Sequence, residues 1–173
     1  VDSDPYPAVV DGRIQWILDG YTVTDKYPLS QRESLEEMTD DSLQENTGFQ
    51  TLPTDEINYL RNSVKATVDA YDGTVTLYEW DEEDPILKAW RSAFPDTVED
   101  KSEISDELME HLRYPEDLFK VQRYQYARYH VEDPTDFYNG ANRWQVPEDP
   151  NSRGDLQPPY RLAVSTPSGG EEP

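Results

Sequence analysis

The sequence predicts an α+β fold, in which antiparallel β-hairpins and a β-meander are followed by a cluster of short helices. Two observations predict it. Asp-Gly pairs, which favour tight hairpin turns, separate stretches of alternating apolar and polar residues in the first half of the chain. After Trp80 the apolar residues recur every third or fourth position, which is the spacing of helices. Strands and helices segregated in this way are typical of the α+β class.

Residues 1–30 are predicted to form the β-meander. Asp11-Gly12 and Asp19-Gly20 both signal a type I′ turn, which needs a positive φ at two positions. Both turns place Ile14, Trp16 and Leu18 on one apolar face. The expected pairs are Val9 with Ile14 and Pro7 with Trp16 around the first turn, and Trp16 with Val23 and Leu18 with Tyr21 around the second.

Residues 31–52 are predicted to be an acidic mobile loop with at most one weak helical turn. The segment Gln31–Gln50 holds six acids against the single base Arg32, and it has few large apolar residues. Such a composition cannot bury enough apolar surface to order a long segment. The acids are Glu33, Glu36, Glu37, Asp40, Asp41 and Glu45.

Residues 64–80 are predicted to form the clearest hairpin, with its turn at Asp72-Gly73. The alternation is strict on both strands. We expect the apolar face to be the core side and the polar face to point away from the core. The apolar face carries Val64, Ala66, Val68, Ala70, Val75 and Leu77, and the other face carries Lys65, Thr67, Asp69, Tyr71, Thr74, Thr76, Tyr78 and Trp80.

Residues 85–140 are predicted to form short helices. Asp84-Pro85 and Asp133-Pro134 are typical helix starts, and Pro115 begins a third helix that runs to about His130. Residues 1–150 then make a single α+β module. Residues 151–173 form a Pro/Gly-rich tail in which residues 162–164 are an isolated strand without its continuation.

The composition excludes several classes of function. With 37 acidic and 15 basic residues, the formal net charge is −22, which repels nucleic-acid phosphates and anionic lipid headgroups. The chain has no cysteine, so disulfides, thiol catalysis and thiolate metal sites are excluded. No stretch approaches the roughly 20 apolar residues that span a bilayer. We therefore expect no nucleic-acid partner and no direct membrane insertion by this chain.

The densest acid cluster is a weak candidate for a calcium site, because hard cations prefer oxygen ligands. The order of its residues lacks the glycine and the distal glutamate of an EF-hand loop. The alternative is a strand end followed by a helix N-terminus, where the helix dipole favours negative charge. The cluster consists of Glu79, Asp81, Glu82, Glu83 and Asp84.

No catalytic residue and no cofactor site is predicted. His111 and His130 are the only histidines, and neither belongs to a His-Glu-x-x-His metalloprotease pattern. The Gly-x-Ser-x-Gly nucleophile elbow and the phosphate-cradling glycine-rich loops are also absent from the sequence. Paired carboxylates could serve glycoside hydrolysis, but 37 acids make such a pair unspecific. We therefore expect both histidines to be helix-end or packing residues, and we favour a non-enzymatic module.

One segment is locally basic. Its bases alternate with aromatic residues, a pattern that indicates nucleic-acid contact only in a basic protein. In this acidic chain we interpret them as partners for acids, either inside the module or in neighbouring parts. The bases are Arg113, Lys120, Arg123 and Arg128, and the aromatic residues are Tyr114, Phe119, Tyr124, Tyr126 and Tyr129.

Three groups of segments carry a family resemblance: DPYPAVVDGRIQWI at residues 4–17; NSVKATVDAYDGTV at 62–75 with DPILKAW at 84–90; and RYPEDLF at 113–119 leading to Tyr138-Asn139 and Trp144. In this order and spacing they resemble uncharacterised protein family 0182. The family consists of large bacterial membrane proteins, common in actinobacteria, with several N-terminal spanning helices and a long extracytoplasmic portion. The resemblance implies that this chain is a piece of the soluble portion. It implies no catalytic residue, because the family has no established activity.

The function expected from these observations is that of an interaction or structural module, displayed on the extracytoplasmic side of a bacterial cell membrane. Its expected partners are other parts of the parent membrane protein, or an envelope protein or glycan. Two alternatives stay open. One is a carboxylate-dependent enzyme acting on a cell-envelope component. The other is a calcium-binding regulatory domain.

Overall fold

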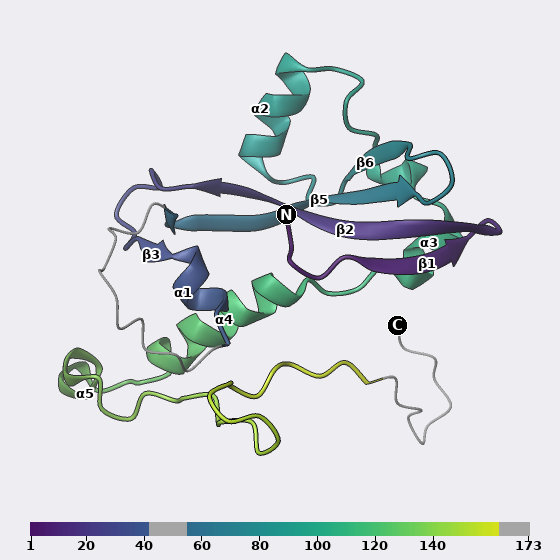
Figure 1. Ribbon diagram of the computed structural model, residues 1–173. Helices are drawn as coiled ribbons and strands as arrows, with labels where there is room; N and C mark the ends of the chain where they lie inside the picture. The colour runs from purple at the N-terminus through teal and green to yellow at the C-terminus, as the bar shows by residue number, and fades with distance from the viewer. Residues whose placement is uncertain (42–54, 163–173) are drawn as a thin grey trace, which may run out of the picture.

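A computed structural model of the chain describes residues 1–41 and 55–162 and confirms the α+β fold (Figure 1). A four-stranded antiparallel sheet has the order β1-β2-β5-β6. Its strands are β1 (Tyr6–Val10), β2 (Arg13–Thr24), β5 (Tyr59–Asp69) and β6 (Val75–Glu79). The main helices are α2 (Pro85–Ala93), α3 (Asp106–His111), α4 (Glu116–Tyr129) and α5 (Pro134–Asn139), and a 3-10 turn, η1 (Lys101–Glu103), precedes α3.

The first predicted turn is confirmed and the second is wrong. Val9 lies opposite Ile14, and the φ angles of Asp11 and Gly12 are both positive. At Asp19-Gly20, in contrast, β2 continues and pairs with β5 instead of folding back. The pairs expected around that second turn are therefore absent from the described register.

Gly20 serves close packing between strands. The register of β2 and β5 shifts between Gly20 and Tyr21, and a Cβ atom added at Gly20 would lie 3.2 Å from the Cβ of Val64. A glycine inside a strand often marks a bulge or a close backbone approach. Gly20 of this Asp-Gly pair therefore allows β2 and β5 to approach closely instead of forming a turn.

The hairpin of β5 and β6 reverses at Gly73 as predicted, but through a loop of residues 70–73 rather than a tight Asp72-Gly73 turn, and the prediction of its core side is wrong. Lys65, Thr67 and Asp69 are buried, whereas Val75 is 59% exposed. Strict alternation shows which residues share a face, not which face the helices cover. Here α3 and α4 cover the polar face, where Lys65 is paired with Asp19.

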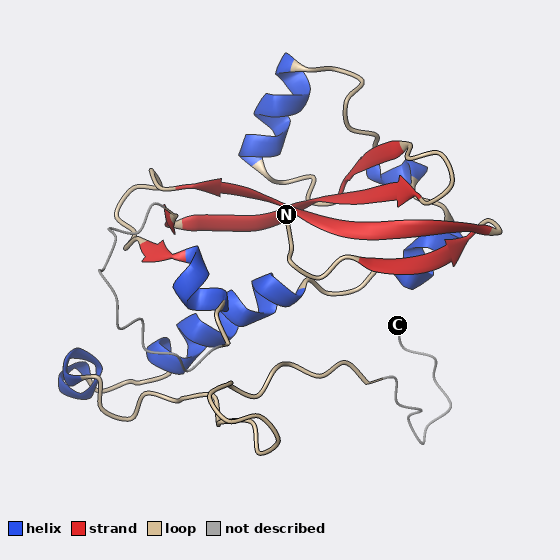
Figure 2. Ribbon diagram, viewed as in Figure 1, coloured by secondary structure: helices blue, strands red, loops and turns tan. Residues whose placement is uncertain are grey.

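Helices lie on both sides of the sheet (Figures 1 and 2). On the side of α3 and α4, the Tyr6 hydroxyl donates to the carbonyl of His111, and Lys65 Nζ donates to the carbonyl of Arg113. We call this side the inner face. On the other side, α2 is tied to the sheet by the ion pair of Arg91 and Glu79. The main apolar core lies on the inner face and consists of Tyr6, Val10, Ile17, Ile104 and Leu108.

Part of the predicted acidic loop is ordered secondary structure. β3 (Glu33–Ser34) pairs with β4 (Glu56–Ile57), and α1 (Leu35–Thr39) follows directly. The Ser34 hydroxyl caps α1 by accepting from the Glu37 N–H. Residues 42–52 of the predicted loop lie outside the described residues. Of the strand predicted at 162–164, only residue 162 is described, and it is not in a strand.

Candidate functional site

The side of the sheet opposite α3 and α4 is an exposed apolar surface, which we call the open face. Its residues follow from the register, because directly opposite residues project to the same side. Val9, Ile14 and Trp16 are 57%, 42% and 42% exposed in the described part of the chain. An apolar surface of this kind marks a site of interaction more often than chance exposure does. The open face consists of Pro7, Val9, Ile14, Trp16, Leu18, Ala66, Val68, Val75 and Leu77.

Helix α2 adds an aromatic pair on the same side of the sheet (Figure 1). Leu87 is buried, and Arg91 bridges the carboxylates of Glu79 and Asp100. Trp90 and Phe94 lie one helical turn apart and stack with 5.4 Å between their ring centroids. Both rings are exposed. The side of the molecule that carries the open face therefore also presents two stacked aromatic rings.

Asp84 fixes the start of α2 to the sheet. Its carboxylate accepts hydrogen bonds from the hydroxyls of Thr22 and Ser63, both at 2.6 Å, and of Tyr59 at 2.7 Å. It also caps the helix by accepting from the N–H of Ile86 at 3.1 Å. Burial by itself raises the pKa of Asp84, but these hydrogen bonds outweigh it and lower the pKa to about 2. The carboxylate is therefore ionised and serves as an anchor.

The inner face buries charged groups in pairs. Asp19 forms an ion pair with Lys65, and both side chains are almost fully buried. Asp2 accepts from the hydroxyl of Tyr21 and from the N–H of Asp117 at the start of α4. Burial raises the pKa of Asp19 against the opposing effect of Lys65, and burial together with Asp2 raises the pKa of Tyr21. The sheet is thus joined to the helices by these polar contacts as well as by the apolar core.

The five acids predicted as weak calcium ligands have different surroundings; they are Glu79, Asp81, Glu82, Glu83 and Asp84. Glu79 and Asp81 form ion pairs with Arg91 and Arg61. Asp84 is the cap of α2, and the other two acids are exposed. Within residues 1–41 and 55–162, no three His, Asp or Glu side chains are placed to hold a metal ion. Calcium binding by this cluster stays a prediction.

The two histidines lie at helix ends, as expected. His111 is the last residue of α3, and His130 is the C-cap of α4. The ring of His130 stacks on Trp144 with 4.0 Å between centroids, and its Nδ1 lies 3.0 Å from the carbonyl oxygen of Tyr126. Both contacts fit a packing role.

Bases of α4 form ion pairs inside the module, as the sequence predicts. Lys120 and Arg123 both contact the carboxylate of Asp41, at 2.6 and 2.7 Å, and Arg128 contacts Glu33 at 2.9 Å. Burial raises the pKa of Asp41, but hydrogen bonds from Lys120 and Arg123 outweigh it and lower the pKa. The partner acids could not be identified from sequence, because they lie in the segment predicted to be a mobile loop.

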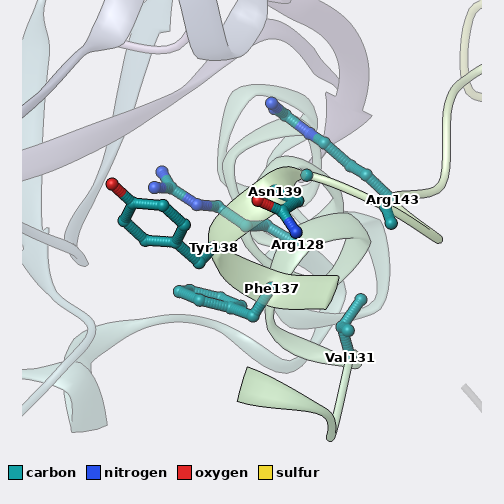
Figure 3. Close-up of a pocket in the computed structure, with 8 residues that line it drawn as sticks. Arg128, Val131, Phe137, Tyr138, Asn139 and Arg143 are labelled. Carbon is teal, nitrogen blue, oxygen red and sulfur yellow. The ribbon is translucent and has the colours of Figure 1, made fainter. Parts of the chain in front are cut away.

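A pocket of about 300 Å³ lies where the C-terminal end of α4 meets α5 (Figure 3). Sequence reasoning missed it. Arg128 belongs to the locally basic segment of the sequence, but its neighbours in the pocket come from α5, which Asp133 caps, and from the residues after it. The Asp133-Pro134 helix start predicts α5 but not how α5 packs against α4, so no signal in the sequence indicates the pocket. The lining residues are Arg128, Val131, Phe137, Tyr138, Asn139, Gly140, Ala141 and Arg143.

Helices of the described segments are all too short or too polar to cross a bilayer. This finding concerns residues 1–41 and 55–162 only.

Comparisons with known proteins match this sequence to parts of longer chains. The family model described as "Uncharacterised protein family (UPF0182)" matches residues 1–173. A UPF0182 protein of Nocardioides sp. is 76% identical over 172 residues, which are 99% of this chain and 17% of the relative. A UPF0182 protein of Streptomyces coelicolor is 58% identical over 170 residues, 96% of this chain and 17% of the relative. A UPF0182 protein of Mycobacteroides abscessus is 61% identical over 164 residues, which are 95% of this chain and 16% of the relative. No solved structure matches the chain.

Proposed function

The chain belongs to the uncharacterised protein family UPF0182, and from this membership we propose that it is a non-catalytic interaction module whose open face docks on another part of the same, longer polypeptide. The observation that carries the proposal is the exposure of the apolar face while the polar face is buried. Fully burying a large apolar side chain contributes about 1.5–3 kcal/mol. The side chains of the open face are already about half buried, so covering each contributes only part of this value, and the contributions add up over several side chains.

The length of the relatives supports an occupant from the same polypeptide. The chain spans about a sixth of the length of the curated relatives it matches. A tethered segment is present at an effective concentration in the millimolar range, so weak apolar contacts suffice for docking. A second copy of this chain is a poorer occupant, because each copy has a net charge of −22 and like charges repel.

The proposed location is the extracytoplasmic side of the cell membrane of a bacterium. This location follows the family resemblance, in which a long extracytoplasmic portion accompanies several spanning helices. The module would then join other extracytoplasmic parts of its parent protein. An envelope protein or glycan on the open face is the alternative occupant.

Cysteine labelling tests the docking proposal. The chain has no cysteine of its own, so single Val75→Cys and Glu110→Cys variants are made in the 173-residue chain and in a full-length protein freed of other cysteines. Val75 lies on the open face, and Glu110 is exposed on α3. We expect a maleimide to label Val75→Cys at least about tenfold more slowly in the full-length protein, because docking covers the site. Glu110→Cys should react equally fast in both.

Two outcomes would contradict the proposal. Equal labelling of Val75→Cys in both proteins would show that the open face stays uncovered. Protection of Val75→Cys already in the 173-residue chain, together with a dimer in sedimentation, would assign the face to a second copy.

A further inference from the structure

We propose that the pocket between α4 and α5 binds a single sugar ring that carries one anionic group, either a phosphate or a carboxylate. This site is separate from the open face, and the proposal does not depend on docking. The pocket volume of about 300 Å³ is at the lower end of ligand sites. It therefore suits one ring with its substituent rather than a chain of sugars.

Two arginines from different elements line the pocket. Arg128 comes from the last turn of α4, and Arg143 comes from the segment after α5. Asn139 lines the same pocket with an amide that can donate and accept (Figure 3). Guanidinium groups recognise phosphate and carboxylate through paired N–H donors, which makes arginine the usual residue for such anions.

Aromatic rings supply the apolar part of the site. Tyr138 is 89% exposed and lines the pocket together with Phe137. The guanidinium carbon of Arg128 lies 5.6 Å from the ring centroid of Phe137, and the Phe137 ring packs on Tyr129 at 5.4 Å. These contacts hold the Arg128 side chain in place before a ligand arrives. An exposed ring beside fixed polar groups suits the apolar face of a sugar.

The charges explain why one anionic group is favoured. Among the ion pairs of residues 1–41 and 55–162, none includes Arg143, whose guanidinium carbon lies 5.1 Å from the ring centroid of Tyr124. Arg128 is partly neutralised by Glu33. An anion at the pocket is therefore attracted by Arg143, which forms no ion pair within the described residues, and by Arg128, which is also paired with Glu33. Polyanions are disfavoured, because the net charge of −22 repels them.

The test uses the 173-residue chain, after a cooperative thermal transition has confirmed that it folds. Glucose 6-phosphate, glucuronate, inorganic phosphate and neutral glucose are titrated while amide and guanidinium NMR signals are followed. We expect glucose 6-phosphate or glucuronate to shift the signals of Gly140 and of the Arg143 Nε–H with a millimolar Kd. Phosphate should bind at least about threefold more weakly, and glucose about tenfold more weakly, because each lacks half of the recognised chemistry.

Three variants separate recognition from folding. Arg143→Gln should weaken binding of the preferred probe about tenfold, as expected for loss of a charged hydrogen-bond donor. Glu33→Gln should tighten binding about twofold or more, because it releases the Arg128 guanidinium from its ion pair. Arg153→Gln changes the net charge as Arg143→Gln does, and it alters an exposed base outside the pocket. It should leave the Kd unchanged.

Several outcomes would overturn the proposal. If phosphate binds as tightly as glucose 6-phosphate, the sugar ring does not contribute to recognition. If glucose binds as tightly as the anionic sugars, the anionic group does not contribute to recognition. An unchanged Kd in Arg143→Gln, an equal loss in Arg153→Gln, or weaker binding in Glu33→Gln would each show that the two guanidinium groups do not form the site.

Discussion

At the scale of single residues, Asp84 shows what sequence can and cannot reveal. The sequence identifies it as a helix cap, because proline follows it at the start of a helical pattern. It does not reveal that the same carboxylate accepts hydrogen bonds from hydroxyls of β2 and β5. The donors Thr22, Tyr59 and Ser63 are 62, 25 and 21 residues away in the sequence. Such contacts depend on the bulge that brings Ser63 and Thr22 together.

Replacing Asp84 tests this anchor. We expect Asp84→Asn to lower the free energy of unfolding at pH 7 by about 3 kcal/mol, because the charged acceptor of several hydrogen bonds is lost. Chemical denaturation measures the loss. Glu83→Gln removes an exposed charge one residue earlier and should change the free energy of unfolding by less than about 0.5 kcal/mol.

The pH dependence follows from the same carboxylate. Its folded pKa of about 2 lies below the ordinary value of 3.8. Its stabilising effect is therefore complete above about pH 4 and is lost as the pH falls toward about 2. The difference in stability between the chain and Asp84→Asn should shrink over that interval. Asp19, whose pKa is raised, acts in the opposite direction but is common to both proteins. A constant difference down to pH 2 would contradict the anchor.

At the scale of elements, the alternation along β2 and β5 predicts which residues share a face but not which face is covered. The register of β1 with β2 follows from local turn chemistry, so it could be predicted. The Asp72-Gly73 pair predicts where β5 and β6 reverse but not the length of the loop between them. The covered side depends on where the helices pack. The polar side can be buried because Asp19 and Lys65 form an ion pair there. No local sequence pattern predicts that these two residues pair.

Two isoleucines in β2 test the assignment of the faces. Ile17 is fully buried on the inner face, whereas Ile14 is 42% exposed on the open face. We expect Ile17→Ala to lower the free energy of unfolding by about 3–4 kcal/mol and Ile14→Ala by about 1 kcal/mol or less. Urea denaturation of the 173-residue chain measures both. Equal losses, or a larger loss at Ile14, would show that the apolar face is the covered one.

At the scale of the whole molecule, the net charge of −22 acts against compactness. Many bases of the described residues already form ion pairs, such as Lys120 and Arg123 with Asp41. The remaining acids repel one another in the folded state. The family and the fold class could be predicted from sequence. The pocket could not, because it depends on how α5 folds back on α4.

Salt tests this balance of charge. Raising sodium chloride from about 0.05 to about 0.5 M shortens the screening length from more than 10 Å to less than 5 Å. We expect the melting temperature of the 173-residue chain to rise by several degrees, because repulsion among the acids is screened more than the partly buried ion pairs are. Potassium chloride should act equally, which excludes a specific ion. A falling melting temperature would show that the ion pairs outweigh the repulsion.

The two outer strands of the sheet, β1 and β6, hinder polymerisation by strand addition at the edges of the sheet. Strand β1 contains Pro7, whose nitrogen carries no hydrogen and so cannot donate to an incoming strand. Along β6, Glu99 accepts from the N–H of Glu79 and donates to the carbonyl of Leu77, and so occupies backbone groups on the outer side. Growth by adding strands to either end, as in amyloid, is therefore hindered. A concentrated solution of the chain should stay free of cross-β fibres even though so much apolar side-chain surface is exposed.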